Sequence, residues 1–374
     1  MEYIKVKDLF TISKGKKVEG LEYKTDESVR YIQIDDLRNN ENLKYCENDK
    51  KYVFASREDI IIAWDGANAG TIGFGLEGAI GSTLAVLRKK ADYMDSEFCG
   101  LFLRSKSNYL RGKCTGATIP HIQKSVLENI EIPKFDIEKQ KKIVEALDKS
   151  QELIDKRKEQ IEALDELVKS RFIEMFGDLK SQKYMELNEC TNFIDYRGKT
   201  PTLSDNGIRI INAKSVGRGV FKYIDEYISE ETYNSWMKRG FPVTGDILFV
   251  TEGHTFGNVC RIPNDLKKFA MGQRVITIQG NKGVINNAFL SQYMQTMAFK
   301  IDIDKYKTGS SAQGIRSKEL QKISVPVPPI KLQNQFAYFV KQVEKLKFEM
   351  ENSLKELEDN FNSLMQKAFK GQLF

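Results

Sequence analysis

The chain of 374 residues lacks several patterns that define common classes of protein. Its five cysteines are isolated, without a CxxC pair, and it has only two histidines, so we expect neither a structural zinc site nor a disulfide framework. No apolar run reaches the roughly 18 residues of a membrane-spanning helix. The opening sequence MEYIKVKDLF has no signal-peptide core. These absences predict a soluble, cytoplasmic protein without a metal site.

Compact signatures of enzyme chemistry are also missing. The sequence has no Walker GK[ST], no N-P-P-[YF] methyltransferase motif and no carboxylate-lysine nuclease signature. Residues 73–78 match G-x-G-x-x-G, but the glycine turn Ala79-Ile80-Gly81-Ser82 follows where a phosphate-binding site needs a helix. We therefore predict that the chain is not an enzyme, has no catalytic residues and binds no cofactor.

The charge balance is mildly basic. The chain has 58 Lys and Arg against 52 Asp and Glu, which gives a net charge of +6. Such a balance is compatible with nucleic-acid binding, but a housekeeping protein with a slightly basic surface would have the same. Charge alone does not decide between these two interpretations.

The sequence contains an internal repeat in which residues 115–176 return as 308–369 at a constant offset of 193. Thr115-Gly116 returns as Thr308-Gly309, and Pro133 returns as Pro326. In the preceding blocks the offset drifts from 183 to 193. The value of 183 comes from aligning Gly15-Lys16-Lys17 with Arg197-Gly198-Lys199. A repeat of this kind indicates one plan used at two places.

The final part of each copy has a heptad pattern. Leu147, Ile154, Ile161, Val168 and Met175 lie seven residues apart, and the second copy continues the same register from Val340 to Ala368. This predicts two long helices with a coiled-coil seam that pack against each other. Proline signals precede both helices, and Asp136 is the expected N-cap of the first.

The blocks before the helices have short apolar strands and frequent glycine turns, which are typical of α/β domains. We therefore divide the chain into a globular domain at 1–137, a long helix at 138–178, a second globular domain at 179–330 and a second long helix at 331–374. The drifting offset indicates that the globular blocks were free to change while the helices kept their length. That is expected if the helices set a distance and the two blocks recognise different targets.

These features together resemble the specificity subunit of type I restriction-modification enzymes. The likeness rests on the Thr-Gly loop followed by Ile122 or Ile315, on Leu-x-x-Ile at 127–130 and 320–323, and on the proline-rich lead into Glu138 to Ile143 or into Gln333. The ending Ala368 to Leu373 fits the family too. The first lead-in departs from the pattern with Lys134-Phe135-Asp136, and so do Asn334 and Gln335, where the first copy has lysines.

The resemblance implies a fold of two α/β target recognition domains in a pseudo-twofold arrangement, spaced by a pair of long antiparallel coiled-coil helices. Each domain would recognise one half of a split, asymmetric site in double-stranded DNA. The helices would dock two modification subunits that methylate adenine with S-adenosylmethionine, and a restriction subunit would join to form the nuclease. The chain itself would carry no chemistry.

Candidate DNA-binding residues are polar or basic side chains on loops that follow apolar strands or carry the Thr-Gly repeat. In the first block they are Lys16, Lys17, Gln33, Trp64, Asp65, Asn68, Thr71, Lys113, Thr115, Thr118 and His121. In the second block they are Arg197, Lys199, Asn212, Lys214, Thr251, Glu252, His254, Thr255, Asn258, Arg274, Lys307, Ser310, Ser311, Gln313 and Arg316. Candidate partner-binding residues at the helix starts are Gln140, Lys141, Lys142, Gln333 and Gln335.

Less specific interpretations of these residues stay open. The loops at 64–71 and 251–258 also fit plain glycine hairpins, the lysine turns also fit solvated turns, and His121 aligns with Gly314, which argues against a shared catalytic role. For the whole chain, one alternative is a coiled-coil scaffold that joins two protein-binding domains. Another is a two-headed DNA-binding regulator without methyltransferase partners.

Overall fold

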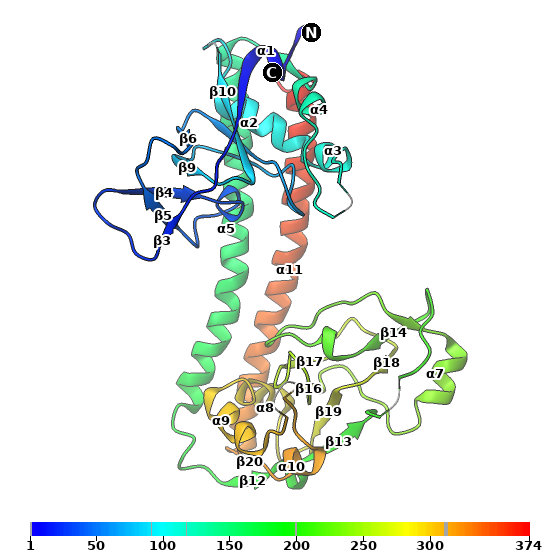
Figure 1. The fold of residues 1–374 in the computed structure, drawn as a ribbon. Coiled ribbons are helices and arrows are strands. Elements are labelled where there is room, and N and C mark those ends of the chain that lie inside the picture. The colour runs from blue at the N-terminus through cyan, green and yellow to red at the C-terminus, as the bar shows by residue number, and fades with distance from the viewer. Residues whose placement is uncertain (1, 91, 117, 199, 310–312) are drawn as a thin grey trace. The chain divides into compact units, whose positions relative to one another are not determined.

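The computed structural model describes residues 2–90, 92–116, 118–198, 200–309 and 313–374. The chain divides into two compact units (Figure 1). Unit 1 consists of Met1–Lys158 with Asn352–Phe374, and unit 2 of Glu159–Glu351. Each unit therefore combines one globular domain with a part of each long helix. No helix among the described residues is long and apolar enough to cross a membrane.

The centre of unit 1 is a four-stranded antiparallel sheet with the order β2-β10-β7-β8. Its strands are β2 (Phe10–Lys14), β10 (Leu84–Lys89), β7 (Ile60–Ala63) and β8 (Ile72–Phe74). Strand β7 is buried along its whole length, as its continuous apolar sequence predicts. A buried strand of this kind holds the loop that follows it in a fixed place.

A second sheet of unit 1 has five strands, of which β4 and β9 are parallel. They are β3 (Gly20–Leu21), β5 (Lys44–Glu47), β4 (Ser28–Ile32), β9 (Gly78–Ile80) and β6 (Phe54–Ala55). Strand β1 (Glu2–Lys5) pairs with β11 (Glu131–Lys134), which leads into the first long helix. The short helices are α1 (Val6–Leu9), η1 (Asp35–Leu37), α2 (Ser96–Ser105), α3 (Ser107–Gly112) and α4 (Lys124–Glu128).

Unit 2 has the same central sheet, in the order β13-β19-β16-β17. These strands are β13 (Thr191–Asp195), β19 (Val275–Gly280), β16 (Ile247–Val250) and β17 (Val259–Arg261). A three-stranded sheet contains β15 (Tyr227–Ile228), β14 (Ile208–Ile211) and β18 (Phe269–Met271). A two-stranded sheet pairs β12 (Tyr184–Glu186) with β20 (Ser324–Pro326). The short helices are α6 (Leu187–Cys190), η2 (Ala213–Ser215), α7 (Glu230–Trp236), α8 (Asn287–Tyr293), α9 (Met297–Tyr306) and α10 (Ser317–Gln321).

The strand registers of the two units reveal the repeat in detail. Lys14 pairs with Ala85 in unit 1, and Asp195 pairs with Ile276 in unit 2. The sequence alignment of Gly15 with Gly198 was therefore wrong by two residues. Gly15 directly follows β2, whereas Gly198 lies three residues beyond the end of β13.

The two long helices predicted from the heptads are present as α5 (Ile137–Phe176) and α11 (Ile330–Phe369), each of 40 residues. In unit 1, the buried residues Leu147 near the start of α5 and Phe369 at the end of α11 belong to one apolar core. In unit 2, the rings of Phe172 on α5 and Phe336 on α11 lie 5.5 Å apart. The helices therefore pack against each other in each unit with opposite chain directions, as predicted.

The start of each long helix is held by side chains. Asp136 caps α5, because its Oδ1 accepts a hydrogen bond from the Lys139 amide at 2.8 Å, as predicted. Gln140 is fully buried, and its side chain accepts from the Asp95 amide at 2.7 Å and donates to the Phe135 carbonyl at 2.8 Å.

Gln333 repeats the role of Gln140 in unit 2. It is also fully buried, accepts from the Asn286 amide at 2.8 Å and donates to the Pro328 carbonyl at 2.7 Å. The prediction that Gln140 and Gln333 contact partners is wrong, because both side chains satisfy backbone groups inside their own units. Lys141, Lys142 and Gln335 are exposed, and their assignment stays a prediction.

Candidate nucleic-acid interface

Two of the predicted loops of unit 1 lie against each other. We define loop pair 1 as residues 64–71, which follow β7, and the described residues of 113–121. The Ile122 amide donates to the Trp64 carbonyl at 2.9 Å, and the Gly66 amide donates to the Pro120 carbonyl at 2.8 Å. Thr115 and His121 close the second loop with two backbone hydrogen bonds of 3.1 and 2.8 Å. The Thr-Gly repeat is therefore attached to the end of a buried strand.

Unit 2 builds the same backbone frame. We define loop pair 2 as residues 251–258 and the described residues of 307–316. The Ile315 amide donates to the Thr251 carbonyl at 2.9 Å, and the Gly253 amide donates to the Gln313 carbonyl at 2.9 Å. The backbones of Thr308 and Gly314 pair as those of Thr115 and His121 do in unit 1. The frame is thus repeated, while its side chains differ.

Glycine is required at one equivalent position of both frames. Gly66 and Gly253 each have φ of 95°, a conformation that residues with a Cβ rarely adopt. Both amides make the hydrogen bond that joins the two loops of their pair. Gly66 and Gly253 are therefore structural, and the candidates for DNA contact are their polar neighbours.

Two polar side chains of loop pair 1 are held by cations, one at the end of strand β2 and one in the turn after η1. Asp65 forms an ion pair with Lys14 at 2.7 Å. Arg38 donates to Asn68 Oδ1 at 2.5 Å. Neither Lys14 nor Arg38 was predicted, although the position of Lys14 just before the Gly15-Lys16-Lys17 turn was a usable signal. These contacts place two additional basic residues beside the loop pair.

Several other predicted residues of unit 1 are half-buried or exposed. Thr115 Oγ1 and His121 Nε2 lie 2.8 Å apart. Gln33 accepts from Lys44 at 2.7 Å, and the Thr71 hydroxyl donates to the Asn68 carbonyl at 2.8 Å. Trp64 is half-buried, and Lys16, Lys17, Lys113 and Thr118 are exposed to solvent. Their contact with DNA stays a prediction.

Thr251 is the predicted contact residue that the structure contradicts in loop pair 2. It is fully buried, and its hydroxyl donates to the Arg274 carbonyl at 3.2 Å. The side chain therefore fixes the Arg274 backbone and cannot reach a ligand. Glu252 is exposed, and its carboxylate lies 3.3 Å from Arg274 Nε.

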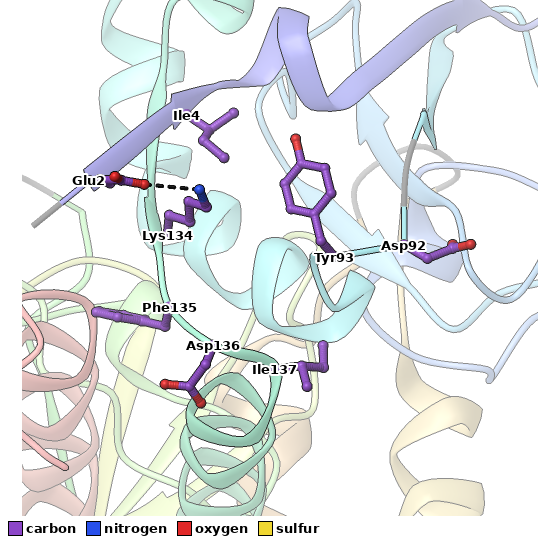
Figure 2. A pocket seen from close by; sticks show the side chains of 8 residues that line it. All are labelled: Glu2, Ile4, Asp92, Tyr93, Lys134, Phe135, Asp136 and Ile137. Carbon is purple, nitrogen blue, oxygen red and sulfur yellow. Dashed lines mark hydrogen bonds and ion pairs between the residues drawn. The ribbon is translucent and has the colours of Figure 1, made fainter.

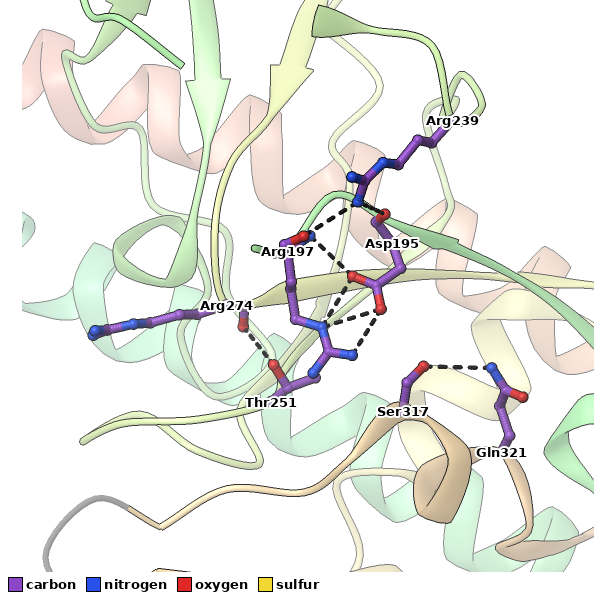
Figure 3. Close-up of polar contacts among 7 residues, drawn as sticks. All are labelled: Asp195, Arg197, Arg239, Thr251, Arg274, Ser317 and Gln321. Atoms are coloured by element: carbon purple, nitrogen blue, oxygen red, sulfur yellow. Dashed lines mark hydrogen bonds and ion pairs between the residues drawn. The ribbon is translucent and has the colours of Figure 1, made fainter. Parts of the chain in front are cut away.

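The basic turn that follows β13 is held by an internal ion pair. The Arg197 guanidinium donates to both carboxylate oxygens of Asp195 at 2.7 to 3.1 Å, and Arg239 donates to the carbonyls of Asp195 and Arg197 at 3.2 Å (Figure 3). Burial would raise the pKa of Asp195, but the hydrogen bonds and charge of Arg197, with the charge of Arg239, lower it below its ordinary value. Arg197 is thus oriented by a carboxylate, which competes with the phosphate that we predicted for it.

The remaining predicted residues of unit 2 fall into three groups. Asn212 and Lys214 both donate to Glu226, and Asn258 donates to the Val216 carbonyl at 3.1 Å. The exposed side chains are His254, Thr255, Lys307, Gln313 and Arg316. Lys199, Ser310 and Ser311 lie outside the described residues. DNA contact by the first two groups stays a prediction.

Open hollows lie at the start of each long helix. In unit 1, the hollow has a volume of about 730 Å³ (Figure 2). It is lined by Glu2, Ile4, Asp92, Tyr93, Lys134, Phe135, Asp136 and Ile137. In unit 2, a hollow of about 560 Å³ is lined by Ile330, Lys331, Asn334, Gln335 and Tyr338. Ile137 and Ile330 are equivalent in the repeat, so both helices offer a mixed apolar and polar surface at their first turns.

The nucleotide-binding alternative has no structural support. Residues 73–78 include the end of β8, the connection at 75–77 and the first residue of β9, and the element after β9 is strand β10 rather than a helix. Among the described residues, no group of three or more His, Cys, Asp or Glu side chains could hold a metal ion. The G-x-G-x-x-G match therefore joins two strands. The predicted glycine turn at 79–82 is right only in part, because Ala79 and Ile80 belong to β9.

Comparisons with known proteins agree with this architecture. The family model "Type I restriction modification DNA specificity domain" matches residues 1–163 and again 176–359. The specificity subunit of type I restriction enzyme MjaVIII of Methanocaldococcus jannaschii is 25% identical over an alignment of 370 positions, which covers 92% of this chain and 86% of that protein.

Two solved structures have a similar fold. One is the S subunit of a type I restriction-modification system from M. genitalium, with a TM-score of 0.59, 19% identity, and coverage of 98% of this chain and 96% of that one. The other comes from a study of complex assembly and conformational transition of the type I R-M system, with a TM-score of 0.61, 16% identity, and coverage of 100% and 98%. Because the family model matches most of the chain in two copies, the chain belongs to the family of type I restriction-modification DNA specificity proteins.

Proposed function

We propose that this chain is the non-catalytic DNA-recognition subunit of a type I restriction-modification complex in the cytoplasm. Each unit recognises one half of a split, asymmetric site in double-stranded DNA. The long helices set the spacing of the half-sites and dock two modification subunits, which methylate adenine with S-adenosylmethionine that they themselves bind. A restriction subunit joins the same complex to form the nuclease.

The observation that carries this proposal is the repeated frame of loop pairs 1 and 2. Both frames use the same backbone hydrogen bonds, and Asp65 and His121 in the first correspond to Glu252 and Gly314 in the second. One frame with two sets of side chains is what recognition of two different sequences requires, because base identity is distinguished by side-chain donors and acceptors.

The helix lengths support the role in spacing. A helix of 40 residues is about 60 Å long at about 1.5 Å per residue. Half-sites that face the same side of a duplex are separated by about 34–36 Å or a multiple of it. The helices are therefore long enough to serve two half-sites.

The hollows at the helix starts support the docking of modification subunits. Ile137 in unit 1 and Tyr338 in unit 2 are 39% and 68% exposed, respectively, and both offer apolar surface. Gln335 and Lys331 add polar groups to the second hollow. Apolar centres with polar rims are typical of interfaces between protein subunits.

Long-read mapping of methyladenine tests the proposal in cells that express this chain with a modification subunit. In one variant, residues 179–330 are exchanged for those of another family member; in the matched control, residues 1–137 are exchanged. We expect a split methylation motif. Each variant should change only one half of it, and the two variants should change different halves. Methylation that does not depend on this chain, with an active modification subunit, would contradict the proposal.

Duplex binding by the purified chain separates recognition from scaffolding. We expect an affinity that falls steeply with salt concentration, since each neutralised phosphate contributes a slope of about −0.9 in the logarithmic plot. A scaffold that never meets DNA would show no binding. Copurification with the modification subunit then distinguishes the complex from a two-headed regulator, which would bind DNA without that partner.

A further inference from the structure

Arg274 has a backbone conformation that an arginine rarely adopts. Its φ is 63°, and it is the single non-glycine residue with positive φ in the described part of the chain. The residue belongs to a three-residue connection between β18 and β19, so both of its flanks are held by sheets. Residues other than glycine persist in such conformations when the surrounding structure imposes them, and they are concentrated at functional sites.

The backbone of Arg274 is fixed by Thr251. The Arg274 carbonyl accepts one hydrogen bond from the Thr251 amide at 2.9 Å and another from the Thr251 hydroxyl at 3.2 Å. Thr251 is itself fully buried at the end of strand β16. The starting point of the Arg274 side chain is therefore set by the core of unit 2.

The side chain of Arg274 lies beside loop pair 2. It extends away from the Arg197–Asp195 pair (Figure 3), and a Cβ built on Gly253 would lie 3.7 Å from its Nη1. Glu252 Oε1 lies 3.3 Å from its Nε, and the two side chains remain 57% and 54% exposed. The carboxylate thus approaches the guanidinium from the Nε side, while the side chain stays open to a ligand.

The equivalent position in unit 1 shows that the frame does not need this conformation. Thr83 occupies it, and the Thr83 carbonyl accepts from the Trp64 amide at 2.7 Å, as that of Arg274 does from Thr251. The backbone of Thr83 does not have a positive φ. The carbonyls of Thr83 and Arg274 therefore serve as the same backbone acceptor in the two units. Among these two residues, only Arg274 has the disfavoured backbone conformation.

We propose that Arg274 is a specificity-determining residue that recognises a guanine in the half-site of unit 2, with Glu252 orienting its guanidinium. This inference rests on the proposed DNA-recognition function. The paired ends of a guanidinium match the O6 and N7 acceptors of guanine in the major groove. A carboxylate 3.3 Å away disfavours a phosphate, which is anionic, but leaves a neutral base edge acceptable. A fixed backbone gives the side chain a defined reach, which base recognition needs and a phosphate contact does not.

The test measures binding of the full chain to a library of duplexes, first to define the preferred split sequence and then to compare variants. Arg274→Lys keeps the charge but loses the forked donor geometry. Lys282→Ala, just beyond the far end of β19, is the control for the loss of a basic side chain elsewhere in unit 2. Thermal unfolding of each variant confirms that the fold is kept.

For Arg274→Lys, we expect the preference for one G·C pair in one half-site to fall by about tenfold or more, with unchanged preferences elsewhere and an unchanged salt slope. Lys282→Ala should keep every preference. The proposal is overturned if Arg274→Lys keeps all preferences, or if it weakens binding to all duplexes equally. Wild-type chain that binds every duplex alike would instead overturn the proposed function, and the role of Arg274 with it.

Discussion

Two glutamines separated by one residue on α11 have opposite environments. Gln333 is fully buried and pairs with backbone groups, whereas Gln335 is exposed in the hollow at the helix start. Gln333→Leu leaves the Asn286 amide and the Pro328 carbonyl without partners, and we expect it to lower the free energy of unfolding by about 1–3 kcal/mol. Gln335→Leu should change it by less than about 0.5 kcal/mol. Chemical denaturation of both variants measures the difference.

The same two variants also separate stability from partner binding. Because Gln335 lines the hollow, we expect Gln335→Leu to alter the affinity for the modification subunit while the fold keeps its stability. Isothermal titration with that subunit provides the measurement. Equal affinities of wild type and Gln335→Leu would remove this residue from the docking surface.

The conformation of Arg274 predicts an unusual effect on stability. Glycine adopts positive φ freely, so Arg274→Gly relieves backbone strain of roughly 1–2 kcal/mol. The added freedom of glycine in the unfolded chain offsets about 0.5–1 kcal/mol of that gain. We therefore expect a melting temperature equal to or above that of wild type, measured by calorimetry. A clear decrease would show that the Arg274 side chain stabilises unit 2, which would argue against strain maintained for recognition.

At the scale of elements, one ion pair lies in the seam of the helix pair. Lys347 on α11 contacts both carboxylate oxygens of Asp165 on α5 at 2.6 and 2.7 Å. Its counterpart in the repeat is Ile154, so the two copies treat this seam position differently. Lys158 and Glu358 form a more exposed interhelical pair within unit 1, at 3.2 Å.

Double-mutant cycles on the two pairs should give different coupling energies. We expect about 0.5–1 kcal/mol for Lys347 and Asp165, whose side chains are 22% and 47% exposed, because a less solvated pair is screened less. The Lys158–Glu358 pair should give a smaller value that disappears at about 1 M salt. Equal couplings at both sites would mean that burial in the seam adds nothing to the ion pair.

The elements also show what the sequence could and could not predict. The heptads identified α5 and α11, because a coiled-coil seam leaves a regular apolar pattern. The loops after β7 and β16 were found because apolar strands run into them. Their attachment to the Thr-Gly loops was not predicted, since the bond between Ile122 and Trp64 joins residues that are distant in the chain.

Single side chains escaped prediction for a related reason. Gln140 looks like any surface glutamine in a charged helix, and its burial depends on the Asp95 amide, which the fold brings to it. Thr251 belongs to a polar loop sequence, yet it is buried directly after strand β16, where its hydroxyl donates to the Arg274 carbonyl. Arg38 gave no pattern at all, and its contact with Asn68 depends on how η1 lies beside the loop. Local patterns reveal elements, whereas such contacts arise from the tertiary fold.

At the scale of the molecule, the two loop pairs belong to different compact units and share no hydrogen-bond partner among the described residues. Sites without shared partners have additive effects on free energy, within about 0.3–0.5 kcal/mol. We therefore expect Asn68→Ala to change the preference in one half of the split motif and Arg274→Lys to change it in the other. The double variant should lose the sum of the two discrimination energies, measured by competitive binding to duplexes altered in either half.

Competitive binding distinguishes a molecule that recognises its two half-sites independently from one in which the two binding events are coupled. If the halves are recognised independently, each single variant leaves the other half untouched, and new pairs of half-sites can be produced by exchanging one unit at a time. If the double variant loses much less than the sum, engagement of one half-site governs the other, and the long helices would transmit binding as well as set spacing. Asn68→Asp is the control that separates the contact with Arg38 from a contact with DNA. It keeps the oxygen that accepts from Arg38, but it removes the amide donor that Asn68 offers to DNA. The additive outcome is the one that repeated frames in two different compact units predict.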